Sequence, residues 1–306
     1  MKKIKVAVIG TGHLGKIHAR IYNNMPQVEL AGICDIDKEK ANSCALEFKS
    51  IAYLDYKKLI NKVDAVSIAT PTITHFKIAR AFLKNNIHVL VEKPITSTTL
   101  EAQKLIKFAR AKRKILQVGH VERFNPAIRT IQGFCKNPKF IECHRLSPYP
   151  KRGTDVSVIL DLMIHDIDIV LSLVKSPLLQ THAIGVNVLS PNEDIASVRL
   201  IFKNGTVCNL TASRVSDEGM RKIRIFQKDS YLSLDYAQQK IICYKKENNR
   251  IIKEEILVAK KEPLAEELSS FIECIKKGKQ PIVRGKEAKD ALEIALAITK
   301  QIRKNA

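Results

Sequence analysis

The fold is decided by the stretch IKVAVIGTGHLG, which occupies residues 4–15. Apolar residues fill most of its first half, as in a strand that is covered on both faces. Its second half is a glycine loop that a helix-like pattern follows at once, and it reads Gly10-Thr11-Gly12-His13-Leu14-Gly15. In such a loop Gly10 permits a tight turn, Gly12 lets the backbone approach a pyrophosphate, and Gly15 lets helix and strand pack closely. The stretch therefore predicts a dinucleotide-binding unit.

An acidic residue belongs about 20 positions beyond the last glycine of such a loop, at the end of the second strand. Asp35 stands there, directly after the apolar run Leu30–Cys34. Its carboxylate would accept hydrogen bonds from the ribose 2′-hydroxyl and repel a 2′-phosphate, which favours NAD over NADP. Lys38 lies close enough to keep NADP open as the less favoured cofactor. The alternative is a purely structural glycine turn with Asp35 as a helix cap.

Short apolar runs alternate with helix-like stretches through the first ~120 residues. Strands are expected at Lys5–Ile9, Glu29–Cys34, Ala65–Ala69, His88–Val91 and Leu116–Gly119, and helices near 13–24, 38–48, 74–85 and 98–112. This alternation predicts an α/β fold, a Rossmann domain with a doubly wound parallel sheet over residues 1–120.

The alternation stops after Gly119, so a second domain is expected over residues 121–306. Loops and extended segments punctuated by prolines come first, and one very apolar helix follows from Val156 to about Val174. Strand-like runs then occupy Leu179–Leu189, Ala196–Phe202, Thr206–Ser213, Lys222–Gln227, Tyr231–Asp235 and Lys240–Tyr244. Two amphipathic helices, near 263–277 and 286–304, close the chain. The pattern predicts an α+β domain with a large, mostly antiparallel open sheet.

Cysteine use and apolar runs indicate the compartment. The seven cysteines are scattered singly without any Cys-x-x-Cys pair, which suggests neither a disulfide framework nor a zinc or other metal site. No apolar run approaches the ~18 residues of a membrane span, and the first one is too short for a signal sequence. A cytoplasmic protein without membrane partners is expected.

The formal charge of +21 is the one extreme feature of the composition. Lysines are spread along the whole chain, aromatic residues are only 6%, and no basic helix with interleaved aromatics is present. A solvated lysine-rich surface is therefore favoured over attraction of an anionic substrate, and nucleic acid is not expected as a partner.

Lys93 follows an apolar strand in the segment Val89-Leu90-Val91-Glu92-Lys93-Pro94. A lysine at the carboxyl end of a parallel strand points into the ligand crevice, where it would lie near the nicotinamide. It could donate a proton or stabilise an alkoxide. The alternative is an exposed lysine at the end of a strand.

The apolar helix contains Asp161 and His165, four residues apart on one face, with Asp168 three residues beyond. Burying carboxylates and an imidazole costs several kcal/mol each unless they are paired. Histidine is a natural general base near neutral pH, and an adjacent carboxylate can orient it. The pattern favours catalysis, with a satisfied pair in the core as the alternative.

Four motifs in order resemble the glucose–fructose oxidoreductase/inositol dehydrogenase (Gfo/Idh/MocA) family over essentially the whole chain. They are Gly10–Gly15, Ala69-Thr70-Pro71-x-x-x-His75, Glu92-Lys93-Pro94 and Asp161-x-x-x-His165. The resemblance implies that Lys93, Asp161 and His165 are catalytic. It implies a cofactor site formed by the glycine loop, Asp35, Thr70, Pro71, His75, Glu92 and Lys93. It also implies a second domain whose open sheet serves a homodimer or homotetramer.

A narrower likeness points to a sugar nucleotide. The segments Gly119–Pro126, Asp155–Asp168 and Ser213–Ser216 are similar to bacterial and archaeal UDP-N-acetylglucosamine 3-dehydrogenases. That group oxidises the sugar 3-hydroxyl to a ketone that an aminotransferase can aminate, which implies lipopolysaccharide or cell-surface polysaccharide biosynthesis. The substrate residues then implied are Lys93, Arg123, Asn125, Arg152, Asp161, His165 and Arg214. Arginine forks suit the diphosphate, although each could equally form a surface ion pair.

In the resulting hypothesis, His165 removes the proton of the sugar hydroxyl and Lys93 stabilises the alkoxide charge that develops. Asp161 orients these two side chains. Three alternatives stay open. Another sugar or cyclitol dehydrogenase of the family would keep the site and change the substrate. A biliverdin-reductase-like enzyme would not need Asp161 and His165. A non-enzymatic, dinucleotide-sensing regulator would be expected to lose Lys93 or His165.

Overall fold

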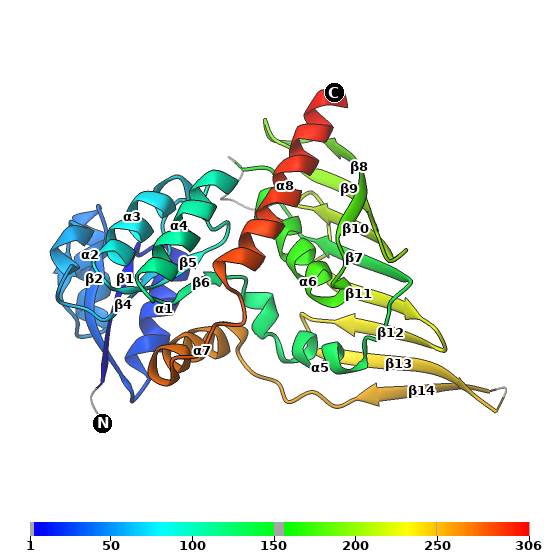
Figure 1. Ribbon diagram of the computed structural model, residues 1–306, viewed down its shortest axis with the longest axis horizontal. Coiled ribbons are helices and arrows are strands. Elements are labelled where there is room, and N and C mark those ends of the chain that lie inside the picture. The colour runs from blue at the N-terminus through cyan, green and yellow to red at the C-terminus, as the bar shows by residue number, and fades with distance from the viewer. Residues whose placement is uncertain (1–2, 150–155, 249, 306) are drawn as a thin grey trace. The chain divides into compact units, whose positions relative to one another are not determined.

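The computed structural model describes residues 3–149, 156–248 and 250–305, and the chain forms two compact units (Figure 1). Unit 1 comprises Met1–Val121 with Pro263–Asp290, and unit 2 comprises Glu122–Glu262 with Ala291–Ala306. The first boundary lies within a residue of the one expected from sequence. The expectation of an uninterrupted second domain is not met, because residues 263–290 group with unit 1.

Unit 1 holds a sheet of six parallel strands in the order β3-β2-β1-β4-β5-β6. The strands are β1 Ile4–Ile9, β2 Val28–Cys34, β3 Ala52–Tyr53, β4 Ala65–Ile68, β5 His88–Glu92 and β6 Leu116–Gly119. The helical elements are α1 His13–Asn23, α2 Lys38–Glu47, the short η1 Tyr56–Leu59, α3 Thr72–Lys84, α4 Thr99–Ala111 and α7 Pro263–Lys277. The expected doubly wound Rossmann sheet is confirmed. Its strand order reverses between β1 and β4, which is where ligands bind in such sheets.

Two layers of helices cover the sheet of unit 1. Helices α1, α2 and α7 share one hydrophobic cluster with the strands, and its members include Tyr22, Leu268 and Phe271. Helices α3 and α4 pack against each other and against β4, β5 and β6. Apolar strands buried on both faces are therefore the physical reason for the continuous apolar runs in the sequence.

Unit 2 holds a sheet of eight strands in the order β14-β13-β12-β11-β7-β10-β9-β8, antiparallel except for the pair β7 and β10. The strands are β7 Phe140–Leu146, β8 Leu178–Val186, β9 Ile195–Phe202, β10 Val207–Ser213, β11 Met220–Gln227, β12 Ser230–Asp235, β13 Lys240–Glu247 and β14 Arg250–Ile256. The large, mostly antiparallel sheet is confirmed. Two of its strands, β7 and β14, were not among those expected.

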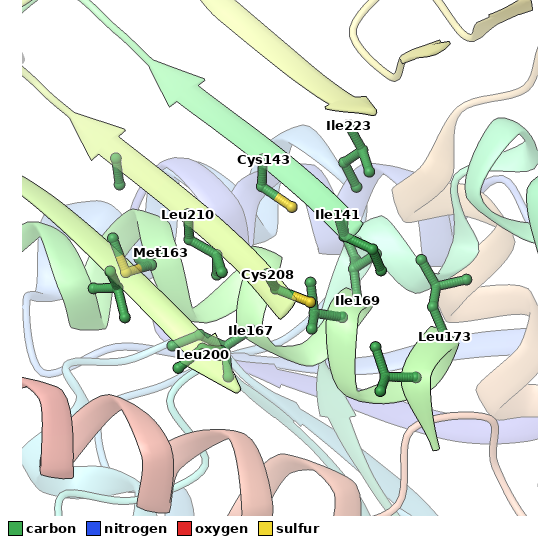
Figure 2. Close-up of a cluster of buried hydrophobic side chains, with 14 of the residues drawn as sticks. Ile141, Cys143, Met163, Ile167, Ile169, Leu173, Leu200, Cys208, Leu210 and Ile223 are labelled. Carbon is green, nitrogen blue, oxygen red and sulfur yellow. The ribbon is translucent and has the colours of Figure 1, made fainter. Parts of the chain in front are cut away.

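Helices cover one face of this sheet. They are α5 Pro126–Phe134, the π-helical turn η3 Ile159–Met163, α6 Ile164–Val174 and the part of α8 Gly285–Asn305 from Ala291 onward, and the short η2 Val121–Phe124 precedes them in the chain. Figure 2 shows Ile167, Ile169 and Leu173 of α6 packed against inward side chains such as Ile141 and Leu210. This cluster is the hydrophobic core of unit 2, and it holds α6, which carries His165, against the sheet.

The opposite face of the same sheet has a different character. Four aromatic rings from neighbouring strands, Phe140, Phe226, Tyr231 and Tyr244, stack in a row with centroid separations of 4.7–5.6 Å. Ile184 and Val186 of β8 are 66% and 51% exposed. Side chains on this face are thus more exposed than those facing the core, as expected of an open sheet.

The described residues contain no helix that is long and apolar enough to cross a membrane. Nor do they contain a cluster of three or more histidine, cysteine or acidic side chains that could hold a metal ion. The seven cysteines are all free thiols.

Candidate active site

Two glycines of the loop after β1 are required by the backbone around them. Gly10 has a φ of +90°, and a Cβ there would lie 2.5 Å from the carbonyl oxygen of Ala69. A Cβ on Gly15 would lie 1.8 Å from the carbonyl oxygen of Gly10. The tight turn and the close approach of α1 to β1 therefore agree with the roles expected from the sequence.

No contact within the protein requires a glycine at position 12. A Cβ at this position would meet nothing within 4 Å. No side chain caps the N-terminus of α1, and no acidic residue lies in its first turn. Free N–H groups and the positive end of the helix dipole are the features that bind a pyrophosphate, and the open space at Gly12 lets it approach. The residues present fit a bound dinucleotide.

Asp35 is held by the glycine loop itself. Its Oδ2 accepts the Thr11 N–H and the Thr11 hydroxyl, both at 2.7 Å, and its Oδ1 accepts the Asp37 N–H at 3.0 Å. Burial alone would raise the pKa of Asp35, but these hydrogen bonds and the charge of Lys40 outweigh it and lower the pKa. The helix-cap alternative is wrong, because Asp37 caps α2. A charged carboxylate therefore stands beside the glycine loop.

His75 connects the loops that follow β4 and β5. Its Nδ1 lies 2.9 Å from the Pro94 carbonyl oxygen and its Nε2 lies 2.8 Å from the Thr70 carbonyl oxygen. The ring is buried, and burial lowers its pKa despite these carbonyl partners. Pro71 precedes α3 as its N-terminal cap residue. His75 thus joins the two loops at the carboxyl edge of the sheet.

Glu92 is buried beneath that edge. Its Oε1 lies 3.2 Å from Nε2 of His18, whose Nδ1 lies 2.6 Å from the Ser67 hydroxyl. A Cβ on Gly119 would lie 2.7 Å from the carboxylate oxygens, so a larger residue there would have to displace the Glu92 side chain. Burial would raise the pKa of Glu92, but the hydrogen bond and charge of His18 and the charge of Lys93 lower it.

His18 was missed by the sequence reasoning. It lies on α1 within KIHAR, a stretch with no chemical motif, and its partners come from β4 and β5. Only tertiary pairing reveals its role. Through Glu92 it supports the strand end from which Lys93 emerges.

Lys93 follows β5 at the carboxyl edge of the parallel sheet, as its position in the sequence predicted. Its side chain is half-buried, its backbone N–H donates to Oε2 of Glu92 at 3.3 Å, and the peptide bond to Pro94 is cis. The amine is therefore carried by a strand end that the buried Glu92 holds in place.

Asp161 and His165 lie where a π-helical turn passes into α6. The Ile164 N–H bonds to the carbonyl oxygen of Ile159, five residues back, so the chain is locally wider than an α-helix. Both side chains are half-buried. Single π-helical turns inside α-helices occur frequently at functional sites. The apolar helix was expected, but its π-helical turn was not.

The expected diphosphate residues have partners of another kind. The Arg123 guanidinium lies 3.2 Å from Oδ1 of Asp168, with side chains that are 11% and 2% exposed. Asn125 is buried, caps α5 and donates to the Tyr236 carbonyl oxygen at 2.9 Å. Arg152 and its neighbour Lys151 lie outside the described residues.

Arg214 is completely buried. Its Nε donates to Oδ1 of Asp194 at 2.8 Å, one terminal nitrogen to the Val156 carbonyl oxygen at 2.7 Å, and the other to the Ser190 hydroxyl at 2.9 Å. Arg123 and Arg214 thus correspond to the ion-pair alternative, with pairs that are buried rather than on the surface. Arg123, Asn125 and Arg214 thus have partners within the protein, and their contact with a substrate stays a prediction.

Two family descriptions match the chain. Residues 4–120 match the oxidoreductase family with an NAD-binding Rossmann fold, and residues 127–232 match the GFO/IDH/MocA C-terminal domain. The two matches fall on the N-terminal part of unit 1 and on much of unit 2.

Individual relatives are similar over nearly the whole chain. A UDP-N-acetylglucosamine 3-dehydrogenase from Acidithiobacillus ferrooxidans is 36% identical over 97% of each chain. A solved structure under that name and organism matches with a TM-score of 0.95 over 99% of both chains, at 36% identity. A scyllo-inositol 2-dehydrogenase (NAD⁺) from Bacillus subtilis is 28% identical over 98% of this chain and 94% of its own.

Proposed function

The chain belongs to the GFO/IDH/MocA family of oxidoreductases, and we propose that it oxidises the 3-hydroxyl of UDP-N-acetylglucosamine to a ketone. The observation that carries the proposal is the end-to-end likeness to an enzyme of that name, at 36% identity over 97% of each chain. The likeness extends through unit 2, the unit that holds Asp161 and His165. More distant relatives named as inositol dehydrogenases keep a cyclitol as the second candidate substrate.

The proposed chemistry uses three side chains of this protein. His165 removes the proton from the 3-hydroxyl as general base, and Asp161 orients it. Lys93 hydrogen-bonds to the same oxygen and stabilises the negative charge that develops there. The bound nicotinamide supplies the hydride acceptor. The half-buried setting of all three side chains supports these roles, since partly desolvated groups interact more strongly.

NAD is the proposed cofactor in preference to NADP. Asp35 keeps its negative charge at neutral pH, and such a carboxylate repels a 2′-phosphate. The open space at Gly12 and the uncapped N-terminus of α1 would hold the pyrophosphate. We expect kcat/KM to be higher with NAD than with NADP when both are measured on the same substrate.

Substrate and cofactor are tested together by incubating the protein with NAD and a panel of UDP-sugars, free sugars and cyclitols. A keto acid and a dehydrogenase that reduces it recycle the NADH. Reduction of the product with borodeuteride marks the oxidised carbon, which NMR then identifies. Deuterium at C3 of the UDP-N-acetylglucosamine product supports the proposal. Turnover of free sugars or cyclitols alone would assign a different dehydrogenase of the same family.

The open face of the sheet in unit 2 is the proposed contact between copies of the chain. Ile184 and Val186 on β8 are more than half exposed, and large exposed apolar side chains gathered on one face mark interaction surfaces. Burying this face in a homodimer or homotetramer would remove it from water. Replacing Ile184 with Glu should shift the mass measured by light scattering to that of a smaller species.

A cytoplasmic enzyme of surface-polysaccharide or lipopolysaccharide biosynthesis is the proposed setting. All seven cysteines are free and most are buried, as in a reducing compartment. A 3-keto sugar nucleotide is a substrate for amination, so the product suits an aminotransferase. Deleting the gene should remove the 3-amino sugar from the cell's surface glycolipids.

A further inference from the structure

A buried polar cluster interrupts the core of unit 2. Arg145 of β7, Asp166 of α6 and Tyr236 just after β12 are 4%, 1% and 2% exposed. Arg145 lies on the inward face of its strand, in line with Ile141 and Cys143, where the pattern calls for an apolar residue. Figure 2 shows those two neighbours facing α6. A cation therefore stands in a row of hydrophobic side chains.

The geometry of the cluster is specific. Nε and one terminal nitrogen of Arg145 donate to the two carboxylate oxygens of Asp166 at 2.9 and 3.1 Å. The Tyr236 hydroxyl donates to Oδ1 of Asp166 and accepts from Arg145 at 3.1 Å. Burial holds the pKa of Tyr236 well above its ordinary value, so the phenol keeps the proton that it donates. Glu122 neutralises the other side of the guanidinium at 3.3 Å.

Stability alone does not explain such a cluster. Removing two charges from water costs several kcal/mol per ion, and well-packed apolar residues of similar volume are often as stable or more so. A bidentate arginine–carboxylate pair instead fixes the relative orientation of the two elements that carry it, because both of its hydrogen bonds form at only one such orientation.

The rotation of α6 about its own axis has to be fixed by such a pair. Its buried positions occur almost all round the helix, so hydrophobic burial by itself selects no single rotation about the helix axis. Asp166 follows His165 directly, and successive residues point about 100° apart around a helix. Fixing the direction of Asp166 therefore fixes the direction of His165.

We infer that Arg145 and Tyr236 are positioning residues that aim His165 by locking Asp166, and hence the rotation of α6, against the sheet. The inference rests on the proposed function, in which His165 is the general base. Arg123 acts on the same helix two residues further along, through its ion pair with Asp168.

Two substitutions test the inference in the full-length protein. Arg145→Lys keeps the charge and loses the fork, and Tyr236→Phe loses one hydroxyl and keeps the ring. Both should lower kcat about ten- to a hundredfold, since small misplacements of a catalytic group have effects of that size. The KM for NAD should stay near wild type, and both variants should remain folded at the assay temperature even though lost buried hydrogen bonds lower the melting temperature. Arg224→Lys and Tyr244→Phe, on the opposite face of the same sheet, are the matched controls and should retain full turnover.

A double variant separates positioning from general structural damage. In a His165→Ala background the general base is absent, so Arg145→Lys should lower turnover no further. The same factor of loss in both backgrounds would overturn the inference, as would unchanged kcat in folded Arg145→Lys and Tyr236→Phe proteins.

The ring signals of His165 give a readout that does not depend on the substrate. Comparison with His165→Ala assigns them in the NMR spectrum. They should shift in Arg145→Lys and Tyr236→Phe and stay in place in Arg224→Lys, and an unmoved signal in the first two variants would overturn the inference whatever the substrate. Equal turnover of wild type and His165→Ala would overturn the proposed general base, and the positioning role with it.

Discussion

His165 is the residue on which the proposed chemistry depends most directly. It lies half-buried just after the π-helical turn, four residues beyond Asp161. Replacing His165 with Ala removes the general base, and such groups contribute roughly 10²–10⁴-fold to turnover. We expect kcat to fall by about that factor, measured as NADH formation from UDP-N-acetylglucosamine.

Cofactor binding provides the internal control for this variant. The glycine loop and Asp35 belong to unit 1, whereas His165 belongs to unit 2, so the dissociation constant for NAD should not change. His182→Ala, an exposed histidine on β8, is the matched substitution and should keep wild-type turnover. A His165→Ala enzyme with undiminished kcat would remove the histidine from the mechanism.

At the scale of single elements, regular burial made most of the fold predictable. The strands β1, β2, β4, β5 and β6 were expected within a residue at each end, because buried parallel strands read as continuous apolar runs. Strand β7 was not predicted because Arg145 occupies an inward position and breaks the alternation of apolar and polar residues. Strand β14 was not predicted because nearly all of its side chains are exposed, so its sequence has no alternation of apolar and polar residues.

The candidate site divides in the same way. Local sequence patterns were enough to identify several candidate residues, each within its own short segment. These are the glycine loop, Asp35, Lys93 and the Asp161/His165 pair. The pairs His18–Glu92, Arg145–Asp166 and Arg214–Asp194 join residues 74, 21 and 20 positions apart. Such partners are chosen by tertiary packing, so no local spacing predicts them.

The loop between β8 and β9 is held by one buried carboxylate, and its stability should depend on pH. Asp194 accepts the N–H groups of residues 188–190 at 2.6–2.9 Å and Nε of Arg214 at 2.8 Å. Burial would raise the pKa of Asp194, but these hydrogen bonds lower it far below its ordinary value. The charged form is thus favoured in the folded state. Its stabilisation is present above the unfolded pKa of about 3.9 and is lost as the pH falls further.

Asp194→Asn should therefore cost about 3–5 kcal/mol of unfolding free energy near neutral pH, as expected for a broken buried ion pair. The difference from wild type should shrink as the pH falls below about 4. Urea unfolding at a series of pH values measures both effects. Asp229→Asn, an exposed aspartate in the β11–β12 turn, should change stability by less than about 0.5 kcal/mol. A difference that persists unchanged into acid would refute the role of the carboxylate charge.

At the scale of the whole molecule, the chain does not complete one unit before starting the other. It leaves unit 1 after Val121, returns for Pro263–Asp290, and enters unit 2 again within α8. Helix α7 packs against α1, the helix that begins at the glycine loop, and contributes Leu268, Phe271 and Ile272 to the core of unit 1. The cofactor unit is therefore completed by a segment about 250 residues away in sequence, a distance at which no local pattern could assign it.

A substitution in α7 should consequently impair the cofactor unit. Phe271 is completely buried, and Phe→Ala in a core costs about 3–5 kcal/mol. We expect Phe271→Ala to lower the denaturant midpoint of the transition that abolishes NADH binding, followed by the fluorescence of the bound NADH. Phe134→Ala, on α5 of unit 2 and 44% exposed, is the matched control and should leave that transition nearly in place. If both variants left NAD binding equally resistant to denaturant, α7 would not be part of the cofactor unit's core, and residues 1–121 would have to be stable without it.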